Sequence, residues 1–298
     1  MSRKMTRIVA ILILAAMLAG AIFSVRAGAE EYDETAQLLE ETSEEVIAAA
    51  KLAKEEAWKA AHIGDGRTVV LDPGHSSVIP SGSVPLGPGS GQMKAADTYG
   101  TSGVATGMAE YTLTMSICQQ LRTVLEAKGY KVLLTHETND TAHSCVDRAK
   151  VANDADADIF LRIHANGSDD RYVTGAMTIC ITPSNPFYPE QYAESRRLSE
   201  ILLRDYTEET GIEEEYVWET DSMTGNNWAQ MPCMILEMGY MTNPEEDRLM
   251  ADPEFQRVMV AAIAKGIDNY FAEAEPAAEP EAAAESETDA EEEPSAQE

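Results

Sequence analysis

Four side chains in the middle of the chain could carry out metal-assisted hydrolysis. Two are histidines and two are glutamates, and each lies next to an apolar run or at the start of a helical pattern: His75, Glu110, His164 and Glu237. Two imidazoles and one carboxylate form a three-ligand set that suits zinc and leaves a fourth position for water. A carboxylate outside that set is suited to handling protons during hydrolysis.

Each of these residues also has a structural interpretation. A histidine at a strand end is often held only by hydrogen bonds, and a glutamate such as Glu110 favours the positive end of a helix dipole. Glu237 follows the apolar run 234–236, where a carboxylate needs a partner or a raised pKa. Topology alone leaves both the structural and the functional interpretations open.

Strands and helices alternate along residues 67–271 and must bring these side chains together. Such alternation predicts an α/β fold with a mostly parallel, twisted sheet and helices on both faces. The carboxyl ends of its strands and the helix N-termini share one rim, where ligands bind. The patterns predict strands at 68–71, 131–135, 159–163, 176–181, 216–219 and 234–236, and helices at 110–128, 146–153, 188–209 and 253–270.

A Gly-, Ser- and Pro-rich stretch, 76–108, follows the first predicted strand. We expect a loop there, and a loop of this length in a compact domain is usually functional or mobile.

The four cysteines, Cys118, Cys145, Cys180 and Cys233, lack the spacing of a zinc clip. Four cysteines allow three disulfide pairings, and buried free thiols are an equal alternative.

Composition excludes several classes of protein. The 298 residues include 22 Lys and Arg against 52 Asp and Glu, a formal net charge of −30. A chain this acidic, with no basic stripe, is not expected to bind nucleic acid. An apolar content of 44% is enough for a core, and a single long apolar run excludes a polytopic membrane protein.

The ends of the chain differ from its middle. Residues 1–29 combine basic residues, the apolar run 8–25 and a small-residue site, which predicts a signal peptide or an uncleaved signal anchor. Residues 30–66 are interpreted as an acidic helical linker. Residues 272–298, rich in Ala, Glu and Pro, are expected to be a disordered acidic tail. We therefore expect a secreted or extracytoplasmic protein, bound to the membrane only if the first segment is retained.

The middle of the chain resembles the zinc-dependent N-acetylmuramoyl-L-alanine amidases of the type 3 family. Four blocks carry the resemblance, in the family's order: 70–75 (VLDPGH), 110–113 (EYTL), 148–153 followed by 157–166 (ADIFLRIHAN), and 236–243 (LEMGYMTN). The resemblance implies that 67–271 form a catalytic domain with one Zn²⁺. By the same resemblance, His75, Glu110 and His164 are the zinc ligands and Glu237 is the catalytic carboxylate. It further implies a cell-wall-associated enzyme that cleaves the amide between N-acetylmuramic acid and L-alanine in peptidoglycan.

Two features depart from the general family pattern. The stretch between the first histidine and the ligand glutamate is long, as in a subgroup seen in Gram-positive anaerobes. Arg162 stands where a small serine is common, and we expect it to pair with a buried carboxylate or to help hold substrate. Arg162, Asn166 and Asn227 are the candidate substrate-binding residues.

Two other functions remain as alternatives. One is a zinc carboxypeptidase or endopeptidase acting on the wall peptides. The other is a catalytically inactive wall-binding module. The sequence indicates no oligomeric state.

Overall fold

The computed structural model describes residues 66–273. The predicted signal segment 1–29, nearly all of the linker 30–66 and all but the first two residues of the tail 272–298 lie outside the described residues. Within 66–273, no helix is long and apolar enough to cross a bilayer.

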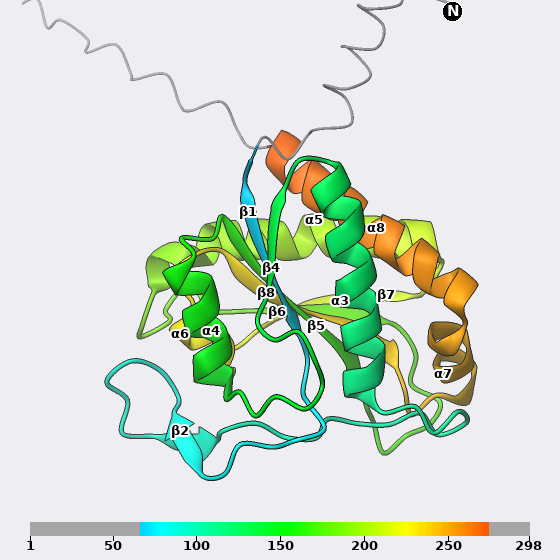
Figure 1. Cartoon of the computed structure of the whole chain (residues 1–298), viewed down its shortest axis with the longest axis horizontal. Coiled ribbons are helices and arrows are strands. Elements are labelled where there is room, and N and C mark those ends of the chain that lie inside the picture. Colours follow the sequence, from blue (N-terminus) through cyan, green and yellow to red (C-terminus); the bar gives the residue numbers. More distant parts are fainter. Residues whose placement is uncertain (1–65, 274–298) are drawn as a thin grey trace, which may run out of the picture.

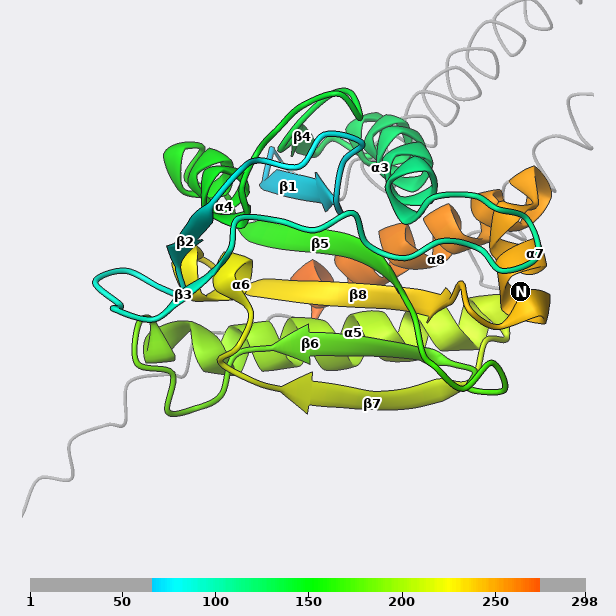
Figure 2. The ribbon, with the colours of Figure 1, turned by 90° about the horizontal axis from the view of Figure 1, so that it is seen from below.

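Six strands form one sheet in the order β4-β1-β5-β8-β6-β7, as Figure 2 shows. The first four are mutually parallel, whereas β6 runs antiparallel to β8 and β7 follows the direction of β6. The predicted mostly parallel sheet is confirmed, with a reversed pair at one edge. The strands are β1 (Thr68–Pro73), β4 (Lys131–Leu134), β5 (Ile159–Asn166), β6 (Ala176–Cys180), β7 (Glu214–Glu219) and β8 (Cys233–Tyr240).

Helices cover both faces of the sheet, as predicted (Figure 1). One face packs against α3 (Glu110–Ala127), α5 (Tyr192–Thr210) and α8 (Pro253–Ala272) over the larger core. The other face packs against α4 (Cys145–Asp154) and α6 (Thr224–Trp228) over a smaller core. Alternate residues of a strand therefore enter different cores. In β1, Val69 and Leu71 face the larger core and Val70 the smaller one.

Local signals fix the helix ends. Ser144 caps α4 in a reciprocal capping box with Asp147, Gly211 ends α5 at a positive φ of 73°, and Asp252 caps α8. The expected start of the third helix, at 188, was too early because a one-turn 3₁₀ helix, η1 (Pro189–Gln191), precedes α5.

The structure adds two short strands and two short helices to the elements predicted. The segment 76–108 contains a small antiparallel hairpin, β2 (Ser83–Pro85) and β3 (Met93–Ala95). The short helices α6 and α7 (Pro244–Ala251) also went unpredicted. For α7 a signal existed, because Asn243 caps a helix that begins with proline and three acidic residues.

Two strands run further than expected, and this relocates the site residues. β5 continues to Asn166 and β8 to Tyr240, so His164 and Glu237 lie within strands and not at their ends. The two are register partners and project from the face that carries the smaller core. Alternate strand residues point to the same face, and α4 and α6 cover only part of it (Figure 2). Polar side chains can therefore stand on the uncovered part.

All four cysteines are free thiols in the structure. Cys118, Cys180 and Cys233 are buried, and Cys145 is half-buried.

Candidate active site

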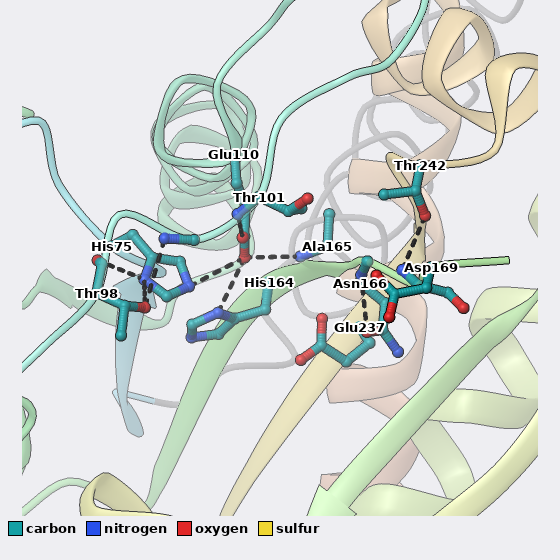
Figure 3. A pocket seen from close by; sticks show the side chains of 13 residues that line it. His75, Thr98, Thr101, Glu110, His164, Ala165, Asn166, Asp169, Glu237 and Thr242 are labelled. Carbon is teal, nitrogen blue, oxygen red and sulfur yellow. Dashed lines mark hydrogen bonds and ion pairs between the residues drawn. The ribbon is translucent and has the colours of Figure 1, made fainter. Parts of the chain in front are cut away.

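Three predicted ligands converge although they are distant in sequence. His75 follows β1, Glu110 is the first residue of α3, and His164 lies in β5. One donor atom from each lies within 4.8 Å of the others. Figure 3 shows both imidazole rings directed at Glu110, whose Oε1 is 3.1 Å from His164 Nδ1 and 3.4 Å from His75 Nε2.

The two ring nitrogens of His75 face different acceptors. Its Nδ1 lies 2.9 Å from the carbonyl oxygen of Thr98, so Nδ1 donates its proton there, and Nε2 faces the carboxylate of Glu110. Burial by itself would lower the pKa of His75, but hydrogen bonds with Asp97 and Glu110 outweigh it and raise the pKa to about 10. The site therefore attracts a cation, either a proton or a metal ion.

Hydrogen bonds keep the side chain of Glu110 in its ionised form. Its Oε2 accepts the backbone N–H of Thr101 at 2.8 Å, and its Oε1 accepts that of Ala165 at 3.1 Å. Burial alone would raise the pKa of Glu110, but hydrogen bonds from His164 and His75 hold it well below its usual range. An ionised, buried oxygen between two imidazoles is a fitting ligand for a divalent ion.

A buried atom without a partner also fits a metal site. His164 Nε2 has no hydrogen-bond partner among the described residues. Burial lowers the pKa of His164, which favours the neutral ring that binds metals. Together, the orphaned nitrogen and the donor set fit zinc.

Glu237 stands beside this cluster and outside it. Its Oε2 is buried without a partner in the described part of the chain. Burial, followed by the negative charge of Glu110, raises the pKa of Glu237 to about 8. A carboxylate with such a pKa and a free oxygen can accept and release a proton near neutral pH.

Two cavities meet at this cluster, and both are lined by His75, Thr98, His164 and Glu237. The larger has a volume of about 520 Å³ and the smaller about 270 Å³. The larger is further lined by Gly100, Thr101, Glu110, Ala165, Asn166, Gly167, Ser168, Asp169 and Thr242. The smaller is further lined by Lys94, Ala95, Asp97, Cys145, Arg148, Arg162, Ser222, Met223, Thr224 and Ile235.

The candidate substrate residues are placed differently. Asn166 lines the larger cavity. Arg162 lines the smaller one and is paired through Nε with the buried Asp72 at 2.9 Å. Asn227 lines neither cavity, because its amide is fully engaged with Leu86, Asn185 and Asp221. The structure thus places Asn227 as a loop support away from the cluster.

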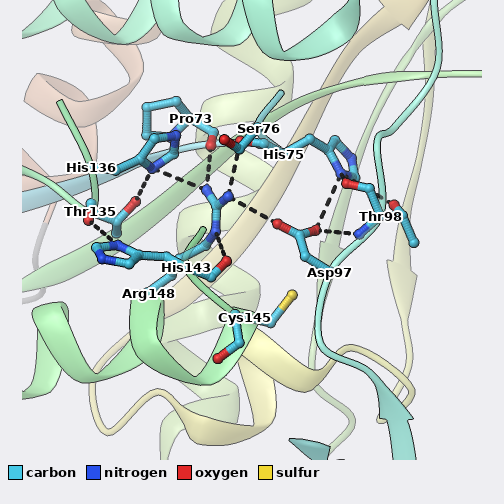
Figure 4. A network of polar contacts seen from close by, with 12 residues as sticks. Pro73, His75, Ser76, Asp97, Thr98, Thr135, His136, His143, Cys145 and Arg148 are labelled. Carbon is cyan, nitrogen blue, oxygen red and sulfur yellow. Dashed lines mark hydrogen bonds and ion pairs between the residues drawn. The ribbon is translucent and has the colours of Figure 1, made fainter. Parts of the chain in front are cut away.

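Sequence reasoning missed the side chain that supports His75. Arg148, which is 1% exposed, donates to the carbonyl oxygens of Pro73 and His75 at 2.7 and 2.9 Å. It also reaches Asp72 at 3.0 Å and Asp97 at 2.9 Å (Figure 4). These bonds hold His75 at a φ of 66°, a strained conformation for a residue with a side chain. The available signal was a basic residue among the apolar positions of a short helix.

Residues 69–269 match the profile of the family described as N-acetylmuramoyl-L-alanine amidase. The chain belongs to this family. Among its relatives, the amidase Rv3717 of Mycobacterium tuberculosis is 26% identical over 70% of this chain and 87% of its own length. The germination-specific amidase of Bacillus subtilis is 23% identical over 75% of this chain and 88% of its own length.

Solved structures of family members share the fold. The amidase Ami1 of Mycobacterium abscessus, in its apo form, matches with a TM-score of 0.62 and 26% identity. The match covers 69% of this chain and 98% of that one. Ami1 of Mycobacterium smegmatis matches with a TM-score of 0.63 and 24% identity, over 70% and 98% of the two chains.

Replacing Arg162 tests its place in the buried ion pair. We expect Arg162→Ala to lower the free energy of unfolding by about 3 kcal/mol, because Asp72 loses one of two buried cations. The matched control is Arg122→Ala, which breaks an exposed pair with Glu137 and should cost less than about 1 kcal/mol. Denaturant unfolding measures both. Equal losses would show that burial of the Arg162 pair has no energetic consequence.

Two glycines with the same φ of 74° separate backbone strain from damage to the site. A Cβ on Gly100 would overlap Glu110 Oε2 and His75 Cδ2, whereas one on Gly107 would meet nothing within 4 Å. Gly107→Ala should lose about 1 kcal/mol of stability through its φ alone, and Gly100→Ala should lose more because the overlap adds to that strain. Only Gly100→Ala should bind zinc more weakly, by about tenfold or more, in competition with a chelator. Equal zinc affinities would contradict the geometry described.

Proposed function

We propose that this chain is a zinc-dependent N-acetylmuramoyl-L-alanine amidase. Its substrate is the amide bond between N-acetylmuramic acid and the L-alanine of the peptidoglycan stem peptide. Family membership and the names of the relatives support peptidoglycan amidase activity. The observation that carries the catalytic assignment is the convergence of His75, Glu110 and His164 beside Glu237.

One zinc ion per catalytic domain would be held by ring nitrogens of His75 and His164 and by the carboxylate of Glu110. When bound, zinc lowers the pKa of a coordinated water to about 7 and polarises a carbonyl group. Thr98, Thr101 and Ala165 keep the ligands in place through backbone hydrogen bonds.

Glu237 moves the proton. Glu237 lines both cavities, and its Oε2 has no hydrogen-bond partner among the described residues. The carboxylate accepts a proton as the water attacks the carbonyl carbon. It then donates that proton to the nitrogen of the departing alanine. No covalent intermediate with the protein is required.

The alternatives differ in product or in turnover. A carboxypeptidase or endopeptidase with the same site would cut between amino acids of the wall peptides. An inactive wall-binding module would have no need of Glu237, and the presence of all four site residues argues against it.

We propose an extracytoplasmic, wall-associated location. The basic and apolar composition of 1–29 supports export, and a cell-wall amidase of Staphylococcus aureus is among the relatives. Association with the membrane follows only if the first segment is retained. In this proposal the catalytic domain is 67–271. An acidic linker, 30–66, precedes it, and an acidic tail, 272–298, follows it.

The reaction product tests the function directly. The zinc-loaded chain should release peptides with a new L-alanine N-terminus from peptidoglycan, leaving an intact muramoyl lactyl group. Mass spectrometry of the digest measures this, and metal analysis should find about one zinc per chain. Chelation should abolish release and added zinc should restore it. Fragments cut within the peptide would favour the peptidase alternative.

Replacing Glu237 tests its role in proton transfer. Glu237→Gln keeps the shape of the side chain but removes the base. We therefore expect kcat to fall by about 10²–10⁴-fold with zinc content unchanged. Metal analysis and a release assay on the same sample check both. Turnover close to that of the wild type would refute the role.

A further inference from the structure

We propose that the two cavities divide the substrate at the scissile bond. The smaller cavity binds the acidic peptide on the leaving side, with Lys94 recognising a carboxylate, and the larger cavity binds the neutral glycan. This assignment rests on the proposed amidase function and specifies which part of the substrate each cavity takes.

The two cavities extend from the cluster toward different parts of the fold. Both are lined by Glu237 and the two histidines, so each cavity can take one product of a bond cleaved beside these residues. The larger cavity extends over the loop after β5 and toward Thr242. The smaller extends toward β3, α4 and the loop before α6.

The larger cavity offers mostly uncharged polar groups. Its walls carry the hydroxyls of Thr101, Ser168 and Thr242 and the amide of Asn166, with Asp169 as the only carboxylate beyond the catalytic cluster. Hydroxyl and amide groups match the hydroxyl and acetamido groups of a sugar, which carry no charge. About 520 Å³ is within the usual range for a small-molecule site.

The smaller cavity is lined by three basic side chains in an otherwise acidic protein. Lys94, Arg148 and Arg162 line it together with Asp97 and Glu237, although the chain carries a net charge of −30. Asp72 and Asp97 neutralise the two arginines through bonds of 2.9 to 3.0 Å. Lys94 has no acidic partner among residues 66–273, so its charge is left for a ligand.

Lys94 is also held in position. It is exposed on β3, and its Nζ donates to the carbonyl oxygen of Ser222 at 2.7 Å. An ammonium group has three donors, so two remain for a carboxylate. Arg162 adds free donors but no net charge, because Asp72 neutralises it while its terminal nitrogens make only long contacts, 3.4 Å to Asn226 and 3.9 Å to Cys145.

The remaining walls suit a short peptide. Ala95, Met223 and Ile235 provide apolar surface next to Glu237, which fits the methyl group of an alanine at the cleaved bond. A carboxylate from the next residue of an acidic peptide would then lie toward Lys94. The glycan has no such charge, so the charge of Lys94 distinguishes the two sides of the bond.

Two small substrates test the assignment. One is N-acetylmuramoyl-L-alanyl-glutamate with free carboxylates, and the other is the same compound with both carboxylates converted to carboxamides. The wild-type enzyme should have a KM about tenfold lower for the acid, the size of one charge-assisted hydrogen bond. Lys94→Gln should raise the KM for the acid about tenfold, leaving kcat and the KM for the carboxamide unchanged.

Two further variants make the result specific. Lys94→Arg should retain the preference for the acid, because it retains the charge. Lys131→Gln, an exposed lysine at the opposite end of the sheet, should match the wild type. Equal KM values for the two substrates in the wild type, or a preference that survives in Lys94→Gln, would overturn the assignment. Hydrolysis of neither substrate by the wild type would overturn the proposed function itself, and the assignment with it.

Discussion

The site depends on one buried carboxylate oxygen that lies between two imidazole rings. Glu110 Oε1 is 3.1 Å from His164 Nδ1 and 3.4 Å from His75 Nε2, so its negative charge requires a proton or a metal ion between these atoms. Backbone groups stabilise the arrangement. Two backbone N–H groups donate to Glu110, and the carbonyl oxygen of Thr98 accepts from His75. These bonds fix the directions of Glu110 and His75 before any ion binds, and a divalent ion would displace the proton that the raised pKa of His75 keeps on its ring.

The support behind the ligands is a buried charge network. Arg148 joins the end of β1 to Asp97, and Asp72 joins Arg148 to Arg162. A network of this kind is favourable only when every member is satisfied, because an isolated buried charge is costly. Its bonds to the carbonyls of Pro73 and His75 offset the strain of the positive φ at His75. The geometry of the proposed metal site therefore depends on residues outside the ligand set.

The sheet determines where the reaction can occur. His164 and Glu237 are register partners on adjacent parallel strands, so the proposed metal ligand and the proposed proton carrier share one face. That face is only partly covered by α4 and α6, and the hairpin β2–β3 lies against the same side through Lys94 and Trp228. The long segment after β1 thus forms one wall of the smaller cavity.

Much of this protein follows from the sequence alone. Periodicity and capping residues indicated an α/β sheet with helices on both faces, and the four motif blocks indicated His75, Glu110, His164 and Glu237. The sequence did not reveal the hairpin, the reversal of β6, the extension of β5 and β8, or the role of Arg148. Strands of three residues show no periodicity, and apolar patterns do not encode strand direction.

Only the tertiary structure could decide that Asn227 supports a loop, that Arg162 meets Asp72 and that Lys94 has no acidic partner in the described residues. Those outcomes depend on hydrogen bonds between residues that are 64 to 141 positions apart in the chain. A local sequence pattern contains no information on such contacts.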